Sequence, residues 1–215
     1  MYEHSKLVCK SAIRIASFFT STISRRLSNF PGQIEQEIKT ILHKVDEEDV
    51  SAITSVLEQR IDGVSRGKLF VLAAFLHDIG KPKTATPKLT ANDEFKLFGT
   101  SIGTYIEQKF SDHEQVGAML FLGVAEQLGL SEEQTMYIYK LIKYHKDITD
   151  AVKDARKARA ERSLVLRRSL EGIAVNYRAQ DIFYEAVLLY LADSMGKTGE
   201  LSFSNDIAEL EQAFF

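Results

Sequence analysis

The stretch Leu69–Thr84, with the sequence LFVLAAFLHDIGKPKT, decides the fold of this chain. Its first eight residues are all apolar, which is typical of a helix that is buried on every side in the middle of a domain. Gly80 offers a C-terminal stop, and Pro82 forbids continuation of the helix. His77 and Asp78 are therefore carried to the end of the most buried helix. Because an unpaired polar group would be costly there, we expect a partner, and a metal ion would satisfy both side chains at once.

The composition indicates an all-α globular protein. Of the 215 residues, 45% are hydrophobic and only three are proline, and apolar residues recur at helical spacing over almost the whole chain. No stretch alternates convincingly as a strand, and no internal repeat or linker divides the sequence. We therefore predict a single helical domain over residues 1–215.

Net charge and hydropathy exclude several classes of protein. The formal net charge of -3 argues against general avidity for nucleic acids. The amino terminus lacks an apolar block of the signal-peptide type, and no run of about 18 apolar residues occurs anywhere. We expect a cytoplasmic protein without a membrane partner.

Two expected helices carry a histidine on their apolar side. Residues from His4 to about Ser24 form one amphipathic helix, in which His4 lies on the same stripe as Leu7. A helix that Asp112 or Ser111 could cap carries His113 on its apolar face. Between Asp78 and this helix, residues 79–111 are polar and contain two prolines and three glycines, so we expect a long loop of the kind that often serves as a lid or a binding loop.

Two later helices and one early helix complete the set of candidate residues. Ser131 begins a capping-box-like sequence for a helix that carries His145 toward the core. Asp193 shares a face with apolar residues in a helix over residues 181–194. His43 lies opposite the apolar stripe of a helix over residues 34–45, so we expect it in water.

The number of inward histidines is the main evidence for chemistry. Four of the five histidines fall on core-facing sides, and His43 is the exception. A single buried histidine is more often only hydrogen-bonded in the core. Four of them together with Asp78 and Asp193 instead favour a metal site. Imidazole and carboxylate ligands suit Mn, Fe, Co, Ni, Zn or, less comfortably, Mg.

These residues also carry a family resemblance. The order His4, His77-Asp78, Asp193 resembles the H…HD…D signature of HD-superfamily metal-dependent phosphohydrolases, which are helical bundles. The segments SRGKLFVLAAFLHDIGKPKT, SDHEQVGAMLF, LIKYH and LLYLADSMGKTG resemble more closely the HD region of tRNA nucleotidyltransferases and poly(A) polymerases. The resemblance runs from His4 to about Gly199.

The resemblance implies roles for individual residues. The implied ligands of a first metal ion are His4, His77, Asp78 and Asp193. Asp78 would bridge to a second ion, so one or two ions are expected. His113 and His145 match positions that, in some family members, hold the second ion or contact the scissile phosphate. Lys81 would contact phosphate, although a solvated loop lysine is an equally good interpretation of the sequence.

Two further features bear on the partners. A nucleotidyltransferase would need a strand-rich head with a D-x-D metal pair, and the sequence before His4 contains none, so we do not expect nucleotide addition by this chain. The run from Lys153 to Arg168 holds seven basic and two acidic side chains and could guide RNA toward the site. An ordinary solvated helix face explains the same run slightly better.

We therefore predict a metal-dependent phosphomonoesterase or phosphodiesterase that acts on a nucleotide or an RNA-end phosphate. The alternative is a non-catalytic HD module that keeps a metal for stability and binds RNA or a partner chain. The presence of all six ligand-type residues favours the enzyme.

Overall fold

Helices dominate the part of the chain that the structure describes, in agreement with the all-α prediction. The computed structural model describes residues 2–20, 47–91, 96–97, 100–101, 104–158 and 161–198. The helices are α1 (Tyr2–Thr20), α3 (Glu47–Glu58), α4 (Arg66–Leu76), α5 (Lys81–Thr84), α6 (His113–Ala125), α7 (Glu132–Tyr144), α8 (Asp147–Lys157), α9 (Arg162–Ala179) and α10 (Phe183–Thr198). The strands are β1 (Arg60–Ile61), β2 (Val64–Ser65), β3 (Ala85–Ala91), β4 (Lys96–Leu97), β5 (Thr100–Ser101) and β6 (Thr104–Phe110).

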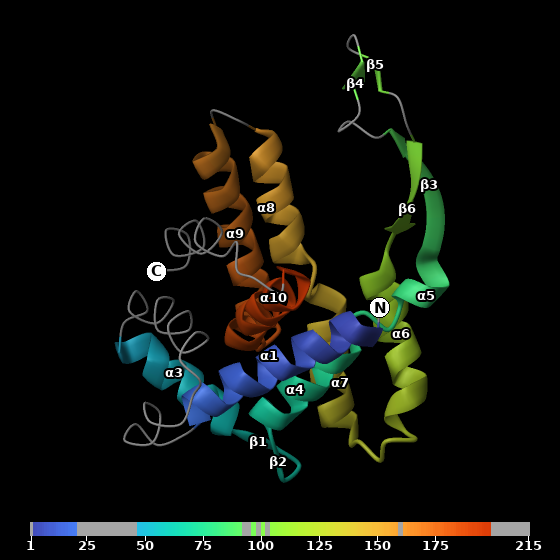
Figure 1. The fold of residues 1–215 in the computed structure, drawn as a ribbon. Helices are drawn as coiled ribbons and strands as arrows, with labels where there is room; N and C mark the ends of the chain where they lie inside the picture. Colours follow the sequence, from blue (N-terminus) through green and yellow to red (C-terminus); the bar gives the residue numbers. More distant parts are fainter. Residues whose placement is uncertain are drawn as a thin grey trace.

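Helix α4 lies in the middle of the bundle, as the apolar sequence predicts. Figure 1 shows α1 crossing over α4 and α10, and α4 also packs against α7. Leu69, Phe70, Ala73 and Ala74 of α4 are at most 2% exposed. Fully burying a side chain such as Leu or Phe contributes about 1.5–3 kcal/mol. The burial is not complete on every side, because Phe75 is 38% exposed.

Helix α1 packs closely on α10 through a glycine. A Cβ atom on Gly196 would lie 2.4 Å from Cγ2 of Val8 and 3.1 Å from its backbone nitrogen, so only glycine allows this approach. Val8 is fully buried, whereas Leu7 is 45% exposed, and its predicted place on the buried stripe is wrong. The close approach brings the start of α1, with His4, beside α10.

Gly80 serves close packing rather than helix termination. Its φ of -77° is an ordinary right-handed value, so it does not end α4 by a left-handed cap as expected. A Cβ atom at this position would lie 2.0 Å from the carbonyl oxygen of His113 and 2.6 Å from the nitrogen of Gly117. The turn after α4 therefore rests directly on the first turn of α6. Pro82 occupies the first turn of the short helix α5, where proline is well tolerated.

The expected long loop over residues 79–111 is largely an antiparallel ribbon. Strand β3 pairs with β6 from Ala85 opposite Phe110 to Ala91 opposite Thr104. In Figure 1 the ribbon projects away from the helices. Each strand of a two-stranded ribbon keeps an outward edge, which accommodates Pro87. The residues TYIEQKF of β6 include aromatic and β-branched side chains that favour strands.

The two predicted helix caps have different outcomes. Asp112 occupies the position directly before α6, but it adopts a left-handed conformation with φ 54° and its side chain makes no cap hydrogen bond, so a capping bond from this aspartate is wrong. Ser131 caps α7 as predicted. Its hydroxyl accepts from the Gln134 nitrogen at 3.2 Å, and its own nitrogen donates to Gln134 Oε1 at 3.1 Å.

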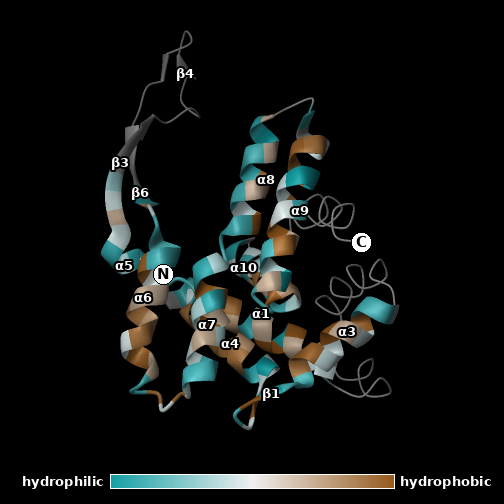
Figure 2. Ribbon diagram, turned by 180° about the vertical axis from the view of Figure 1, so that it is seen from behind, coloured by the Kyte–Doolittle hydropathy of each residue, from teal (hydrophilic) through white to brown (hydrophobic). Residues whose placement is uncertain are grey.

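The charged region after His145 folds as two helices, α8 and α9, that pack on each other. They project to the same side of the bundle as the ribbon (Figure 1). Figure 2 shows mainly hydrophilic residues along α8. The expected helix over residues 34–45, with His43, lies outside the described residues. No helix in the described part of the chain is long and apolar enough to cross a membrane.

Candidate metal centre

Five helices bring the candidate residues together in the core of the bundle. His77 and Asp78 directly follow α4, His113 begins α6, and His145 directly follows α7. These four residues thus lie at the ends of three helices. The other two, His4 of α1 and Asp193 of α10, lie within helices. All six lie close together, and only His4 is more than 7% exposed.

All four histidines present the same nitrogen to the centre. In each ring Nδ1 lies within hydrogen-bonding distance of a backbone carbonyl oxygen. The pairs are His4 with Gly196 at 3.2 Å, His77 with Ala74 at 2.8 Å, His113 with Phe110 at 3.1 Å, and His145 with Ile142 at 2.7 Å. Since a carbonyl only accepts, Nδ1 carries the proton in each case. In the neutral ring Nε2 therefore keeps a lone pair, which is the arrangement that metal-binding histidines require.

Helix geometry explains this shared orientation for two of the rings. The last carbonyl groups of a helix have no partner within the helix. His77 and His145 each follow a helix by one residue and bond the carbonyl three residues earlier. The hydrogen bond that gives this terminal carbonyl a partner therefore also fixes the orientation of the ring.

The carboxylate of Asp193 faces two of the imidazoles. Its Oδ1 lies 3.0 Å from Nε2 of His4 and 3.4 Å from Nε2 of His77. The ligand atoms of these three residues all lie within 4.8 Å of one another. They form one group that can hold a metal ion.

The carboxylate of Asp78 lies between the two pairs of histidines. Its Oδ2 is 3.3 Å from Nε2 of His77 and 3.5 Å from Nε2 of His4. Its Oδ1 is 3.3 Å from Nε2 of His113 and 3.8 Å from Nε2 of His145. Asp78, His77 and His145 form a second group suited to a metal ion. The two oxygens of Asp78 thus face different histidine pairs, as a bridging ligand would.

The donor atoms present fit a divalent metal ion. Nε2 of His77 is fully buried and makes no hydrogen bond with the described residues, although two carboxylates lie nearby. Such a buried nitrogen without a hydrogen bond is costly in a metal-free core. A cation would take the place of the Nε2 proton and bind this nitrogen and the carboxylate oxygens together. Imidazole with carboxylate is a donor set for Mn, Fe, Co, Ni or Zn.

The charges of the centre are strongly coupled. Burial alone would lower the pKa of His77, but the carboxylates of Asp193 and Asp78 outweigh it and raise that pKa to about 9. Burial and the neighbouring His77 charge lower the pKa of His145 to about 3. Burial would raise the pKa values of Asp78 and Asp193, yet their histidine and lysine neighbours hold both well below the usual range. Both carboxylates are therefore ionised at neutral pH and available to a cation.

Two lysines contact the carboxylates from the solvent side. Lys81 is hydrogen-bonded to Oδ2 of Asp78, and Lys197 is hydrogen-bonded to Oδ2 of Asp193. The structure thus places Lys81 at the centre rather than in a solvated loop. Sequence reasoning missed Lys197. The signal was present, because positions 193 and 197 are four apart in one helix and share a face.

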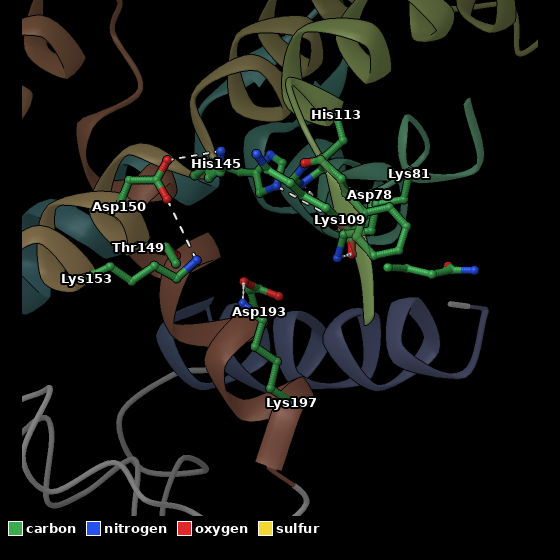
Figure 3. A pocket seen from close by; sticks show the side chains of 13 residues that line it. Asp78, Lys81, Lys109, His113, His145, Thr149, Asp150, Lys153, Asp193 and Lys197 are labelled. Carbon is green, nitrogen blue, oxygen red and sulfur yellow. Dashed lines mark hydrogen bonds and ion pairs between the residues drawn. The ribbon is translucent and has the colours of Figure 1, made fainter. Parts of the chain in front are cut away.

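A pocket of about 420 Å³ opens directly onto this centre. Figure 3 shows its walls, with side chains of α8 on one side and those near β6 and α6 on the other. Its floor contains Asp78, His113, His145 and Asp193, and its walls carry five lysines. These are Lys81, Lys109, Lys146, Lys153 and Lys197. A pocket with carboxylates and imidazoles below and ammonium groups around it suits an anionic ester bound over a metal.

Among the described residues of the basic run from Lys153 to Arg168, Lys153 lines this pocket. Lys157 lies on the exposed surface of α8 and pairs with Asp154 at 2.6 Å, while Arg167 of α9 pairs with Glu171 at 3.0 Å. RNA binding by the whole run stays a prediction.

One comparison with known proteins identifies the family. Residues 33–195 of the 215 match the family model described as the HD domain. The match includes His77, Asp78, His113, His145 and Asp193, whereas His4 precedes it. No curated protein is significantly similar to the chain. The closer resemblance to tRNA nucleotidyltransferases therefore stays a prediction. HD domains are typically metal-dependent phosphohydrolases, and the buried His/Asp groups supply a candidate metal site. The chain belongs to the HD-domain family and is a metal-dependent phosphohydrolase.

Proposed function

We propose that this phosphohydrolase cleaves a phosphate ester of a nucleotide or of an RNA end. The observation that carries the proposal is the position of Asp78, which lies between two histidine pairs at the floor of a lysine-lined pocket. The pocket volume of about 420 Å³ suits a ligand of nucleotide size. The resemblance of HDIGKP and HEQVGA to the HD region of RNA-processing enzymes supports the same substrate class.

We assign the first ion to His4, His77, Asp78 and Asp193. His113 and His145 would hold a second ion together with Asp78, or contact the phosphate directly. When bound, a divalent cation supplies a Lewis acid that lowers the pKa of a coordinated water toward neutrality. Asp78 would be a ligand of both proposed ions, because each of its oxygens faces one histidine pair.

The lysines have a distinct role in the proposed reaction. Phosphoryl transfer depends mostly on positioning and on neutralising charge. Lys81 and Lys197 hold ammonium groups beside the two carboxylates, where they would contact the oxygens of the reacting phosphate. His113 and His145 both line the pocket, and either imidazole, when protonated, would donate a proton to the leaving alkoxide.

The direct test is hydrolysis of two chromogenic esters, one a phosphomonoester and the other a phosphodiester, together with a panel of nucleotides. The protein is first stripped with a chelator and then supplied with Mn²⁺, Ni²⁺ or Mg²⁺. We expect no turnover after stripping and restored turnover with at least one ion, because the proposed water needs a cation for activation. The preferred ester distinguishes phosphatase from phosphodiesterase. Full activity in the stripped protein, or none with any ion and ester, would contradict the proposal.

A further inference from the structure

We propose that the outer end of the pocket binds a second phosphate group of the substrate through Lys109 and Lys153. The inference rests on the proposed function, which places the reacting phosphate at the inner end beside Asp78 and Asp193. The ligand class is therefore an ester that carries at least two phosphate groups. Such a ligand could be a nucleoside polyphosphate or a short oligonucleotide, which share this chemistry.

The size of the pocket leaves room beyond the reacting group. Its volume of about 420 Å³ lies within the range of about 300–1,000 Å³ that is typical of sites for whole small molecules. One phosphate group beside the two carboxylates would occupy only the inner end. The lining continues outward through Gln108 and Lys109 of β6 and through Thr149 and Lys153 of α8.

The charges at the two ends differ in their pairing. At the inner end each lysine has its own carboxylate, since Lys81 pairs with Asp78 and Lys197 with Asp193. At the outer end Lys109 forms no ion pair with any residue that the structure describes. Both lysines of the inner end are thus already paired with carboxylates, whereas the outer end has an ammonium group available to a ligand.

Lys153 is also only weakly engaged. Its Nζ lies 3.8 Å from Oδ1 of Asp150, while the other oxygen of Asp150 is 3.1 Å from Nζ of Lys146. Asp150 therefore pairs more closely with Lys146 than with Lys153. Lys146 also lies 3.8 Å from Glu114, an acid that does not line the pocket.

The side chains that line the outer end carry a net positive charge. Three lysines, Lys109, Lys146 and Lys153, stand there against one carboxylate, that of Asp150. A phosphate group carries about -1.5 to -2 charges at pH 7 and offers several acceptor oxygens. Lysine ammonium groups bind such groups as point charges. Lys109 of β6 and Lys153 of α8 line the pocket from different sides (Figure 3), and we place the second phosphate between them.

The test compares ligands with one and two phosphates. The double variant Lys109→Met/Lys153→Met is assayed on a nucleoside 5′-monophosphate, a nucleoside 5′-diphosphate and a 5′-phosphorylated dinucleotide in the metal-supplemented protein. We expect KM to rise at least about tenfold for substrates with two phosphates and less than about twofold for the monophosphate. A rise with the diphosphate alone identifies a nucleoside polyphosphate as the substrate, and a rise with the dinucleotide alone identifies a nucleic-acid backbone.

Lys157→Met is the matched control, because Lys157 is also an exposed lysine of α8 but lies outside the pocket and pairs with Asp154. It should leave all three KM values unchanged. Equal effects of the double variant on one-phosphate and two-phosphate substrates would overturn the inference. Effects of Lys157→Met as large as those of the double variant would overturn it as well.

A binding measurement separates this inference from the proposed reaction. Calorimetry with inorganic phosphate and with pyrophosphate, again in the metal-supplemented protein, needs no turnover. We expect pyrophosphate to bind more tightly than phosphate and the difference to disappear in the double variant. If no ester is hydrolysed but this difference is found, the proposed function fails and the second phosphate position stands. If esters are hydrolysed but the double variant leaves the difference intact, the second phosphate position is wrong.

Discussion

Replacing Asp78 by asparagine is expected to lower metal-dependent kcat/KM by about a thousandfold or more. Asparagine keeps the shape of the side chain but removes its charge and one of its two acceptor oxygens. In the protein, one oxygen of Asp78 faces His77 at 3.3 Å and the other faces His113 at the same distance. The substitution therefore damages both metal positions, and a loss of several kcal/mol in transition-state stabilisation gives an effect of this size.

Asp112→Asn is the matched control for this experiment. Asp112 is also an aspartate near His113, but it is exposed and makes no cap hydrogen bond. Asparagine tolerates its left-handed backbone conformation, so activity should stay within about twofold of the parent. Steady-state kinetics on the preferred ester, with circular dichroism to establish folding, would measure both variants. Parent-like turnover by a folded Asp78→Asn protein would refute the metal mechanism.

Arg66→Met is expected to lower the free energy of unfolding by about 3–5 kcal/mol. The guanidinium group of Arg66 is buried and donates from Nε to Oε1 of Glu185 at 2.6 Å. Glu185 is fully buried, and its other oxygen has no hydrogen bond with the described residues. Burial already raises the pKa of Glu185 above its usual value despite the arginine. Without Arg66 the hydroxyl of Tyr137, 3.1 Å away, would remain as a neutral hydrogen-bond donor to this carboxylate.

Two further variants make the result specific. Removing both partners in Arg66→Met/Glu185→Leu should recover much of the loss, because no charge is left unpaired in the core. Arg167→Met removes an exposed pair with Glu171 and should cost less than about 1 kcal/mol. Urea denaturation followed by circular dichroism gives all three values. A loss for Arg66→Met no larger than that for Arg167→Met would show that the buried pair does not hold the bundle together.

The buried pair also matters for the site. Arg66 begins α4 and Glu185 lies in the first turn of α10. These helices carry His77 and Asp78 at the end of one and Asp193 near the end of the other. The pair therefore fixes the relative position of two helices whose far ends form the metal centre.

Helical periodicity was enough to find most of the candidate centre. A histidine on the apolar face of a helix points toward the core, and this reasoning identified His4, His113 and His145. The prediction for His4 is notable because the family match begins only at residue 33. The structure nevertheless places His4 at 3.0 Å from Asp193. The periodicity of apolar residues in its own helix was enough to place His4 on the inward side, without help from the family signature.

The ribbon was missed because its signals conflict. Residues 85–110 contain a proline and two glycines, which indicate a loop, and the strand-favouring residues are concentrated in β6. Pairing between residues that are far apart is a tertiary property that local composition does not show. The Asp62-Gly63 hairpin was missed for a simpler reason. Both residues have positive φ, as the dipeptide suggests, but the strands that it joins are only two residues long.

Pairing among polar groups was the other part that the sequence analysis missed. Neither the bond from Lys197 to Asp193 nor the buried contact of Arg66 with Glu185 follows from the periodicity of apolar residues. The contact of Arg66 with Glu185 depends on how α4 and α10 are oriented about their axes, whereas Lys197 and Asp193 lie one turn apart in α10. The close contacts of Gly80 with α6 and of Gly196 with α1 were likewise visible in the sequence only as glycines.

The central claim is that the buried histidines and aspartates hold a divalent metal ion. Calorimetric titration of Mn²⁺ into the chelator-stripped protein, with His77→Ala as the comparison, tests it most directly. The account predicts saturable binding of one or two ions per chain by the parent, a rise in unfolding free energy of about 2.7 kcal/mol at 100 times the dissociation constant, and loss of both effects in His77→Ala. Absence of saturable binding by the parent, or equal binding by a folded His77→Ala variant, would contradict it.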